Sequence, residues 1–216
     1  MFVTFRVRRV EKDLKKQNDL VIAALLSGAI LLCAGFQNGF NSLPTIEETL
    51  LTGVAGVIVS AVLVLIASIL PHDIKHKLVF TRYVNEMPGG RVHRLCKQDS
   101  RIVYEDVRSH WPQVFDENIS ESDRNSLWYR DIYKPVRDSH EVRQAHRNFL
   151  LYRDTLSGLV TLLIVTGLWD FLGNPQLLGE VVPAVYIVLS ISSLLALLAA
   201  RNAGNRFVVN AVAVSQ

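Results

Sequence analysis

The sequence predicts an all-α membrane protein. Its four transmembrane helices form two hairpins, with a small, mostly helical cytoplasmic domain between spans two and three. The first observation is four long apolar segments, at residues 20–36, 50–70, 156–172 and 181–200. Each is close to the roughly 20 apolar residues that cross a bilayer core of about 30 Å. The second is that all 23 Lys and Arg residues lie before the first segment, between the second and third, or after the fourth.

This charge distribution predicts the orientation. The short connections on the other side, residues 37–49 and 173–180, contain no Lys or Arg. Because cationic loops stay in the cytoplasm during insertion, both ends and the long insert are expected to be cytoplasmic, in a multi-pass protein of the cell inner membrane. The expected parts are a basic arm (1–19), a first hairpin (20–70), a cytoplasmic domain (71–155), a second hairpin (156–200) and a cytoplasmic tail (201–216).

The composition narrows the function classes. Residues 71–155 carry 15 Lys and Arg against 13 Asp and Glu. This near balance gives no strong nucleic-acid signal. Membrane lipids are the expected partners of the apolar segments. Cys33 lies in the first segment and Cys96 in the insert, so no disulfide is expected. No nucleophile elbow, Walker loop, Rossmann glycine set or zincin motif is present, so neither an enzyme nor a cofactor is predicted.

Local patterns predict the elements of the insert. Residues 77–84 alternate enough for a short strand, which the Met-Pro-Gly-Gly turn at 87–90 would end. Asp99 and Ser100 would cap a helix that reaches Trp111.

The second half of the insert carries further helix signals. Ser120 and Asp123 would open a helix that stops before Pro135. Helical spacing then continues without a break, so one helix is predicted over residues 139–172. At 1.5 Å per residue it would be about 50 Å long, and roughly half of it would stand in the cytoplasm.

Small residues recur every four positions on two spans, at Thr52, Gly56 and Ser60 and again at Ser192, Ala196 and Ala200. Such faces let helix backbones approach closely in lipid. They can pack within one chain or between subunits of a homo-oligomer, and any pore would need the oligomer. Asp170 is the only charged residue in the four segments, and it is expected at the interface beside Trp169.

Two clusters in the insert are candidate sites. His72, His76, His93 and Cys96 could supply four zinc ligands, with Arg94 and Lys97 favouring the thiolate; the alternative is ordinary surface histidines. Arg137, His140, Arg143 and His146 could contact an anionic ligand where the long helix begins; the alternative is a solvated charged face.

Four stretches of the insert and its flanks resemble a poorly characterised group of bacterial four-span membrane proteins. These stretches are residues 71–75 (PHDIK), 85–90 (NEMPGG), 127–130 (LWYR) and 149–154 (FLLYRD). Small membrane proteins of this plan occur among antiviral defence effectors, and the resemblance implies a role of that kind. It implies no catalytic residue.

The sequence therefore predicts an oligomeric integral membrane effector or channel-like protein, gated or recruited through its cytoplasmic domain by a small ligand or a protein partner. The alternative is a non-conducting membrane anchor or scaffold for a cytoplasmic partner. In that case an aromatic contact patch would come from Trp111, Trp128, Tyr129 and Tyr133.

Overall fold

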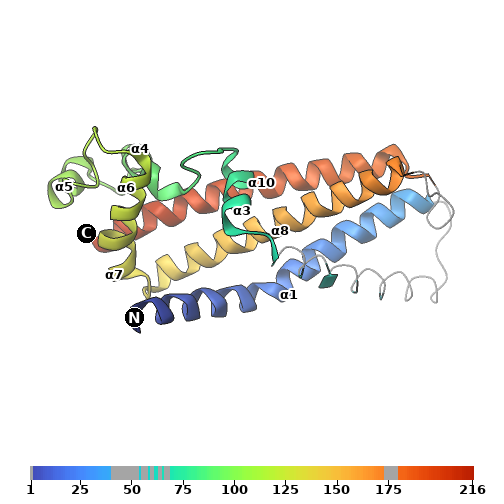
Figure 1. Ribbon diagram of the computed structural model, residues 1–216, viewed down its shortest axis with the longest axis horizontal. Coiled ribbons are helices and arrows are strands. Elements are labelled where there is room, and N and C mark those ends of the chain that lie inside the picture. The colour runs from blue at the N-terminus through green and yellow to red at the C-terminus, as the bar shows by residue number, and fades with distance from the viewer. Residues whose placement is uncertain are drawn as a thin grey trace. The chain divides into compact units, whose positions relative to one another are not determined.

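The computed structural model describes residues 2–39, 70–172 and 180–216, together with six isolated helical positions between 54 and 69; side chains are described from Gln17 onward, except that of Asn38. Every regular element in these ranges is helical (Figure 1). Three apolar stretches within them are long enough to cross a membrane: Gln17–Gln37, His140–Phe171 and Pro183–Ser215. The prediction of a helical chain with membrane-length apolar helices is therefore confirmed, and the number of four spans stays a prediction.

Other predictions fall outside the described residues. They are the small-residue stripe at Thr52, Gly56 and Ser60 and the short connection after the third apolar segment, of which residues 173–179 are not described. Of the second predicted span, residues 50–70, the structure describes only residue 70 and the isolated positions, and the apolar side chains among these, such as Ile58 and Leu65, are exposed.

The chain divides into two compact units. Unit 1 comprises Met1–Lys75 and Leu151–Leu198, and unit 2 comprises His76–Leu150 and Ala199–Gln216. The long helices are α1 (Phe2–Asn38), α8 (His140–Phe171) and α10 (Pro183–Ser215). Because α8 is unbroken over 32 residues, the predicted continuous helix is confirmed. Helices α8 and α10 each supply residues to both units.

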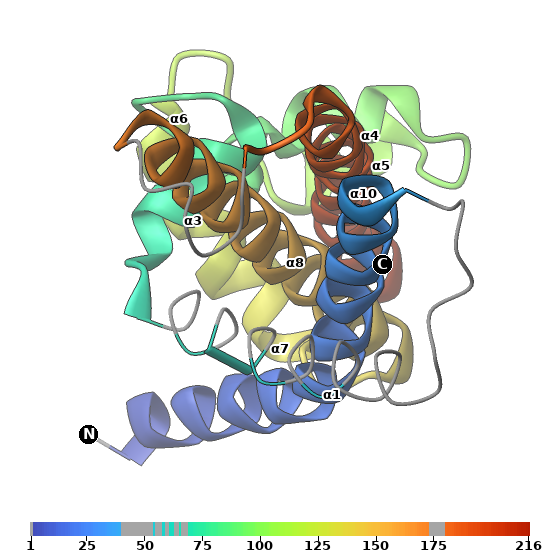
Figure 2. The same cartoon turned by 90° about the vertical axis from the view of Figure 1, so that its right-hand side faces the viewer.

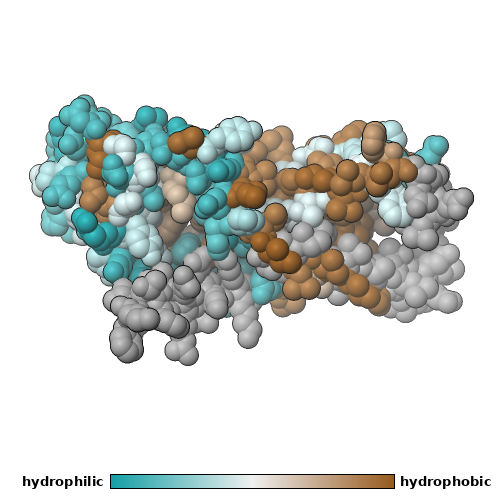
Figure 3. Space-filling view, viewed as in Figure 1, coloured by the Kyte–Doolittle hydropathy of each residue, from teal (hydrophilic) through white to brown (hydrophobic). Residues whose placement is uncertain are grey.

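Unit 1 buries little and exposes much apolar surface. Leu26 of α1, Leu156 of α8 and Leu189 of α10 are buried, and a Cβ atom on Gly158 would lie 2.8 Å from a methyl of Leu26. Figure 3 shows hydrophobic residues over the unit 1 parts of α8 and α10, where side chains such as Ile187 are exposed. A continuous apolar surface is costly in water and favourable in lipid. Within this unit α1 also bends part-way along its length, as Figures 1 and 2 both show.

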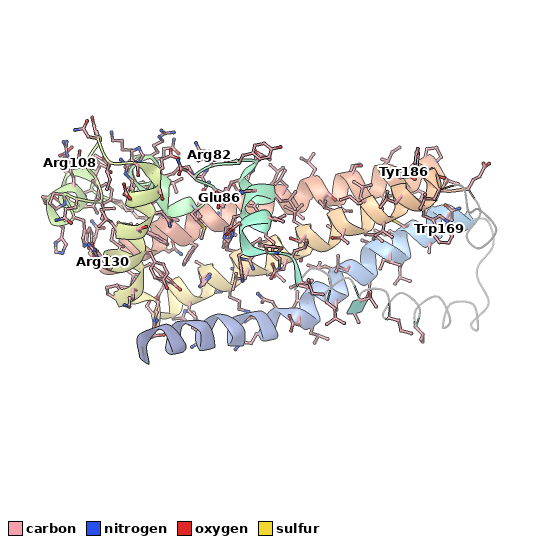
Figure 4. The ribbon with its side chains drawn as sticks, in the orientation of Figure 1. Arg82, Glu86, Arg108, Arg130, Trp169 and Tyr186 are labelled. Atoms are coloured by element: carbon pink, nitrogen blue, oxygen red, sulfur yellow. The ribbon has the colours of Figure 1, made fainter. Side chains whose placement is uncertain are left out.

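Side chains tie the helices of unit 1 together at one end. The Gln37 amide donates to the Glu180 carbonyl oxygen at 2.7 Å and accepts from the Val182 N–H at 3.0 Å. Nearby on α8 and α10, the Tyr186 hydroxyl donates to Asp170 Oδ2 at 3.0 Å; Tyr186 and Trp169 are labelled in Figure 4. The carboxylate of Asp170 is thus hydrogen-bonded as well as exposed.

In unit 2, most of the long insert between the second and third apolar segments folds into short helices. They are α3 (His72–Phe80, of which His76–Phe80 belong to this unit), the 3₁₀ helix η1 (Pro88–Arg91), α4 (Val92–Gln98), α5 (Tyr104–His110), α6 (Glu121–Leu127), the π-helix η2 (Trp128–Tyr133) and α7 (Lys134–Val136).

The predicted strand at residues 77–84 is wrong, because this stretch begins inside α3. The buried positions of α3 are Lys75, His76, Val79 and Phe80, which is the i, i+1, i+4, i+5 spacing of a helix. Two of those four side chains are polar, so the pattern did not show as hydrophobic periodicity. Thr81 ends the helix in the left-handed region at φ 47°.

The next two predicted helices are correct in place but not in detail. Ser120 caps α6 and accepts from the Asp123 N–H at 3.1 Å, as predicted. The helical path does not stop before Pro135, because the wider π turn of η2 leads into α7, where the missing proline N–H is tolerated near the helix start. Asp99 does not cap α5 but accepts from the Arg101 N–H at 3.0 Å, so α5 begins only at Tyr104.

The core of unit 2 is aromatic and includes the predicted tail. Phe207 stacks on His146 with ring centroids 4.6 Å apart and meets Tyr133 edge-on at 5.1 Å. Val208 and Val212 are fully buried, and a Cβ atom on Gly204 would lie 2.8 Å from the Phe80 ring. Residues 201–215 are therefore the last turns of α10 and a structural part of unit 2.

Candidate functional site

Each of the two units contains a group of neighbouring charged side chains. The first, here called the ion cluster, consists of Lys75, Arg153 and Asp154 in unit 1. Lys75 Nζ and Arg153 Nε each lie 3.0 Å from Asp154 Oδ1, and Arg153 Nη2 lies 3.3 Å from Oδ2. The side chains of Lys75 and Arg153 are only 2% and 1% exposed.

The ion cluster joins α3 to α8 within unit 1. Charged groups taken out of water need partners, because an unpaired buried charge costs several kcal/mol. The pairing therefore fixes the start of α3 against α8. In a membrane protein, buried ionisable residues are a default functional hypothesis.

The second group, here called the arginine cluster, consists of Arg82, Arg91, Arg94 and Arg201 in unit 2. Arg201 is held in place, since its Nε donates to the Val79 carbonyl and its Nη2 to Thr81 Oγ1, both at 2.7 Å. Glu121 faces the group, with 2.6 Å to Arg82 Nη1 and 3.7 Å to Arg94 Nη2. Two of the four cations thus share one carboxylate.

Arg91 lies at the centre of the arginine cluster. Its guanidinium carbon is 4.4 Å from the centroid of the Phe80 ring, and its Nε and Nη2 are buried without a hydrogen-bond partner among the described residues. Burial lowers the pKa of Arg91, and the like charges of Arg82 and Arg201 lower it further. The site therefore has donors and positive charge in excess of acceptors.

A buried brace shapes the loops beside the arginine cluster. Arg124 donates to the carbonyls of Val114 at 3.1 Å, Gly90 at 3.4 Å and Asp116 at 2.6 Å, and burial lowers its pKa. A Cβ atom on Gly90 would lie 2.6 Å from the Glu121 carbonyl oxygen, so only glycine fits this approach. The brace brings η1, which carries Arg91, against α6, which carries Glu121.

The anion cluster predicted from the sequence divides in the structure. Arg137 is buried with its Nε 3.7 Å from Asp138, whereas His140 and Arg143 are exposed. His146 Nδ1 lies 3.1 Å from the Tyr133 hydroxyl, within the aromatic core. The structure therefore brings no three of these four side chains to one described site.

The four candidate zinc ligands do not gather either. No group of three or more His, Cys, Asp or Glu side chains that could hold a metal ion occurs in the part of the chain that the structure describes. Burial raises the pKa of the Cys96 thiol to about 12, and Asp99 adds to the effect. The expected stabilisation of the thiolate by Arg94 and Lys97 is therefore not found, because burial and the charge of Asp99 both favour the thiol.

The small-residue stripe of α10 turns inward. Ala196 and Ala200 are buried within the chain and Ser192 is partly buried, so this stripe packs inside one subunit. Of the aromatic residues considered as a contact patch, Trp128 and Tyr133 are also buried core residues.

Sequence reasoning missed both charged groups. The signal for the ion cluster was an Arg-Asp doublet just before the third apolar segment and Lys75 just after the second. The arginine cluster had no local signal. Comparison of the chain with family models, with curated proteins and with solved structures gave no match. The structure itself is therefore the basis for any functional proposal.

Proposed function

We propose that the protein is a multi-span effector of a bacterial inner membrane, in which unit 2 is a cytoplasmic receiving domain and unit 1 is the membrane part that responds. The observation that carries the proposal is the continuity of α8 and α10. Each helix runs unbroken and supplies residues to both units. A rigid helix transmits a displacement along its axis, so a change in unit 2 reaches the spans without an intervening loop.

The proposed output is an ion pathway formed by a homo-oligomer, because a few thin spans enclose little space alone. Flux of ions through liposomes that contain anionic lipid and the purified protein tests this. Asn148→Pro should abolish the flux, because Pro removes a backbone hydrogen bond inside α8, at a cost of about 3 kcal/mol. Asn148 is exposed, so Asn148→Ala is the matched control and should keep the flux.

The mass of the protein in nanodiscs tests the oligomer directly. A strict monomer at working concentration contradicts the proposed pathway, whatever the flux. Orientation is tested with Asn118→Cys, since Asn118 is exposed in unit 2. In a Cys33→Ser background, a membrane-impermeant thiol reagent should label this cysteine in inside-out vesicles and not in intact cells.

A second candidate function is a non-conducting anchor that holds a cytoplasmic partner at the membrane. The observation that favours it is the burial of Ala196 and Ala200 inside the chain, which removes one face otherwise available for subunit contacts. Absence of flux from protein that is correctly oriented and folded would select this function.

A further inference from the structure

Two nitrogen atoms of the Arg91 guanidinium in unit 2, Nε and Nη2, are buried and lack a hydrogen-bond acceptor among the described residues. A buried donor left unsatisfied costs about 1–3 kcal/mol, and more when it is charged. Native proteins leave few such groups, and a ligand or ion that supplies the acceptor is one explanation.

The charges around Arg91 indicate what kind of acceptor is missing. The like charges of Arg82, Arg201 and Arg94 all act on it, and among the residues that the structure describes Glu121 is the one acid that does. Glu86 lies on the same loop as Arg82, as Figure 4 shows, but it is not among those charges. One carboxylate cannot neutralise four guanidinium groups. A multivalent oxyanion with several acceptor oxygens can, and phosphate has this chemistry.

The cluster is also preorganised. Arg201 is fixed by two hydrogen bonds of 2.7 Å, and Arg82 is fixed by its 2.6 Å contact with Glu121. Arg91 is held over the Phe80 ring. Binding would therefore order few side chains, which lowers the entropic cost of association.

An apolar loop tip beside the arginines indicates where the phosphate comes from. Tyr83 and Val84, directly after Arg82, are 89% and 74% exposed. Helix α3, of nine residues, separates this loop from the second apolar segment, a rise of about 14 Å. Exposed aromatic and apolar side chains next to arginines are typical of surfaces that enter the headgroup region of an anionic leaflet.

We propose that Arg82, Arg91, Arg94 and Arg201 form a binding site for a phosphate group, supplied by an anionic lipid headgroup or by a soluble phosphorylated ligand. The loop tip favours the lipid source. This inference rests on the proposed function only because it names the kind of ligand that unit 2 would receive. Binding of that ligand is measured without any ion flux.

Thermophoresis of the full chain in neutral detergent tests the site. The probes are short-chain phosphatidic acid, diacylglycerol with the same chains, and inorganic phosphate. The wild-type protein should bind phosphatidic acid and not diacylglycerol, and Arg91→Met should weaken binding about tenfold or more. Because Arg91 is the last residue of η1 and directly precedes α4, its loss can disturb folding, so Arg94→Gln is the second variant.

Arg130 provides a matched control for the Arg94 variant. The Arg94 side chain is 63% exposed and pairs with Glu121, whereas that of Arg130 is 62% exposed and pairs with Asp131 far from Arg82 in Figure 4. Arg94→Gln should weaken binding about threefold and Arg130→Gln should not change it. Glu121→Gln should strengthen binding about threefold, because it removes the competing carboxylate.

The outcomes separate the two sources. Tighter binding of phosphatidic acid than of inorganic phosphate supports a lipid headgroup, and equal binding supports a soluble phosphorylated ligand. The proposal is overturned if neither phosphate probe binds, or if Arg91→Met and Arg94→Gln bind as the wild type does. Phosphate binding without any liposome flux would leave the site intact and refute only the conducting function.

Discussion

The ion cluster gives the sharpest prediction for stability. Asp154 Oδ1 accepts from two cationic donors at 3.0 Å, and Oδ2 accepts from a third donor at 3.3 Å. Hydrogen bonds to charged groups are worth about 1.5–3 kcal/mol each, and removing one partner of a buried ion pair costs about 3–5 kcal/mol. Lys75 and Arg153 have contacts beyond Asp154, so the loss for Asp154→Ala should lie near the lower end, at about 3 kcal/mol.

The measurement is reversible unfolding in mixed micelles titrated with a denaturing detergent and followed by helical circular dichroism. The matched control is Asp170→Ala, which removes an exposed carboxylate from the same helix together with its hydrogen bond from Tyr186. That change should cost less than about 1 kcal/mol. Lys75→Met and Asp154→Ala together should cost less than the sum of the two single changes, because both remove the same ion pair.

If Asp154→Ala destabilises the protein no more than Asp170→Ala, the ion cluster does not stabilise the fold as predicted. The prediction is also refuted if Lys75→Met adds its full cost to that of Asp154→Ala. Additive costs are expected for side chains that do not interact, whereas partners in one cluster show a coupling energy.

Three further predictions concern packing, capping and thiol chemistry. Gly158→Leu should cost about 1–3 kcal/mol, because it overpacks the approach of α8 to α1; unchanged unfolding in mixed micelles would contradict it. Ser120→Ala should remove the cap of α6 and speed amide exchange in that helix about fivefold, whereas Ser122→Ala on the exposed side should leave it unchanged. In a Cys33→Ser background, the Cys96 thiol, with its pKa raised to about 12, should react with iodoacetamide at pH 7.5 at least about a hundredfold more slowly than free cysteine until the protein is unfolded.

Features that depend on local spacing could be predicted from the sequence. The apolar segments gave the membrane-length helices, and the spacing after Asp138 gave the unbroken α8. The cap at Ser120 followed from a serine three residues before an aspartate, since its hydroxyl satisfies a free N–H within one turn. In each case the residues that decide the structure are neighbours in the chain.

Helix α3 shows where local reasoning failed. Its buried face includes Lys75 and His76, which a hydropathy pattern counts as outward. Their burial depends on partners such as Asp154 and the Phe149 ring, which lie on another helix far along the chain. A polar side chain is recognised as a core residue only once its partner is known.

The two charged clusters escaped prediction for a related reason. The arginine cluster joins Arg82 and Arg91 to Arg201 from the other end of the chain, and no spacing rule connects them. The predicted cluster at Arg137 and His146 was regular in sequence, but Arg137 precedes α8 and lies beside Asp138, whereas His146 is on α8 and lies beside Tyr133. Regular spacing shows which residues share a helix face; it does not show whether that face is open to a ligand.

Unit 2 consists of two separate chain segments, so its folding cannot be completed until the second segment has been synthesised. Its aromatic core needs Phe207, which follows the last apolar segment, together with Tyr133 and Phe149, which precede the third. The ribosome must therefore synthesise residues 151–198 after Leu150 before the core can close, which takes on the order of several seconds at about 5–20 residues per second. During that interval His76–Leu150 exposes an unfinished core. Unit 2 can thus be completed only after the apolar parts of α8 and α10 have been synthesised, so a chain that stops before Phe207 keeps an open core.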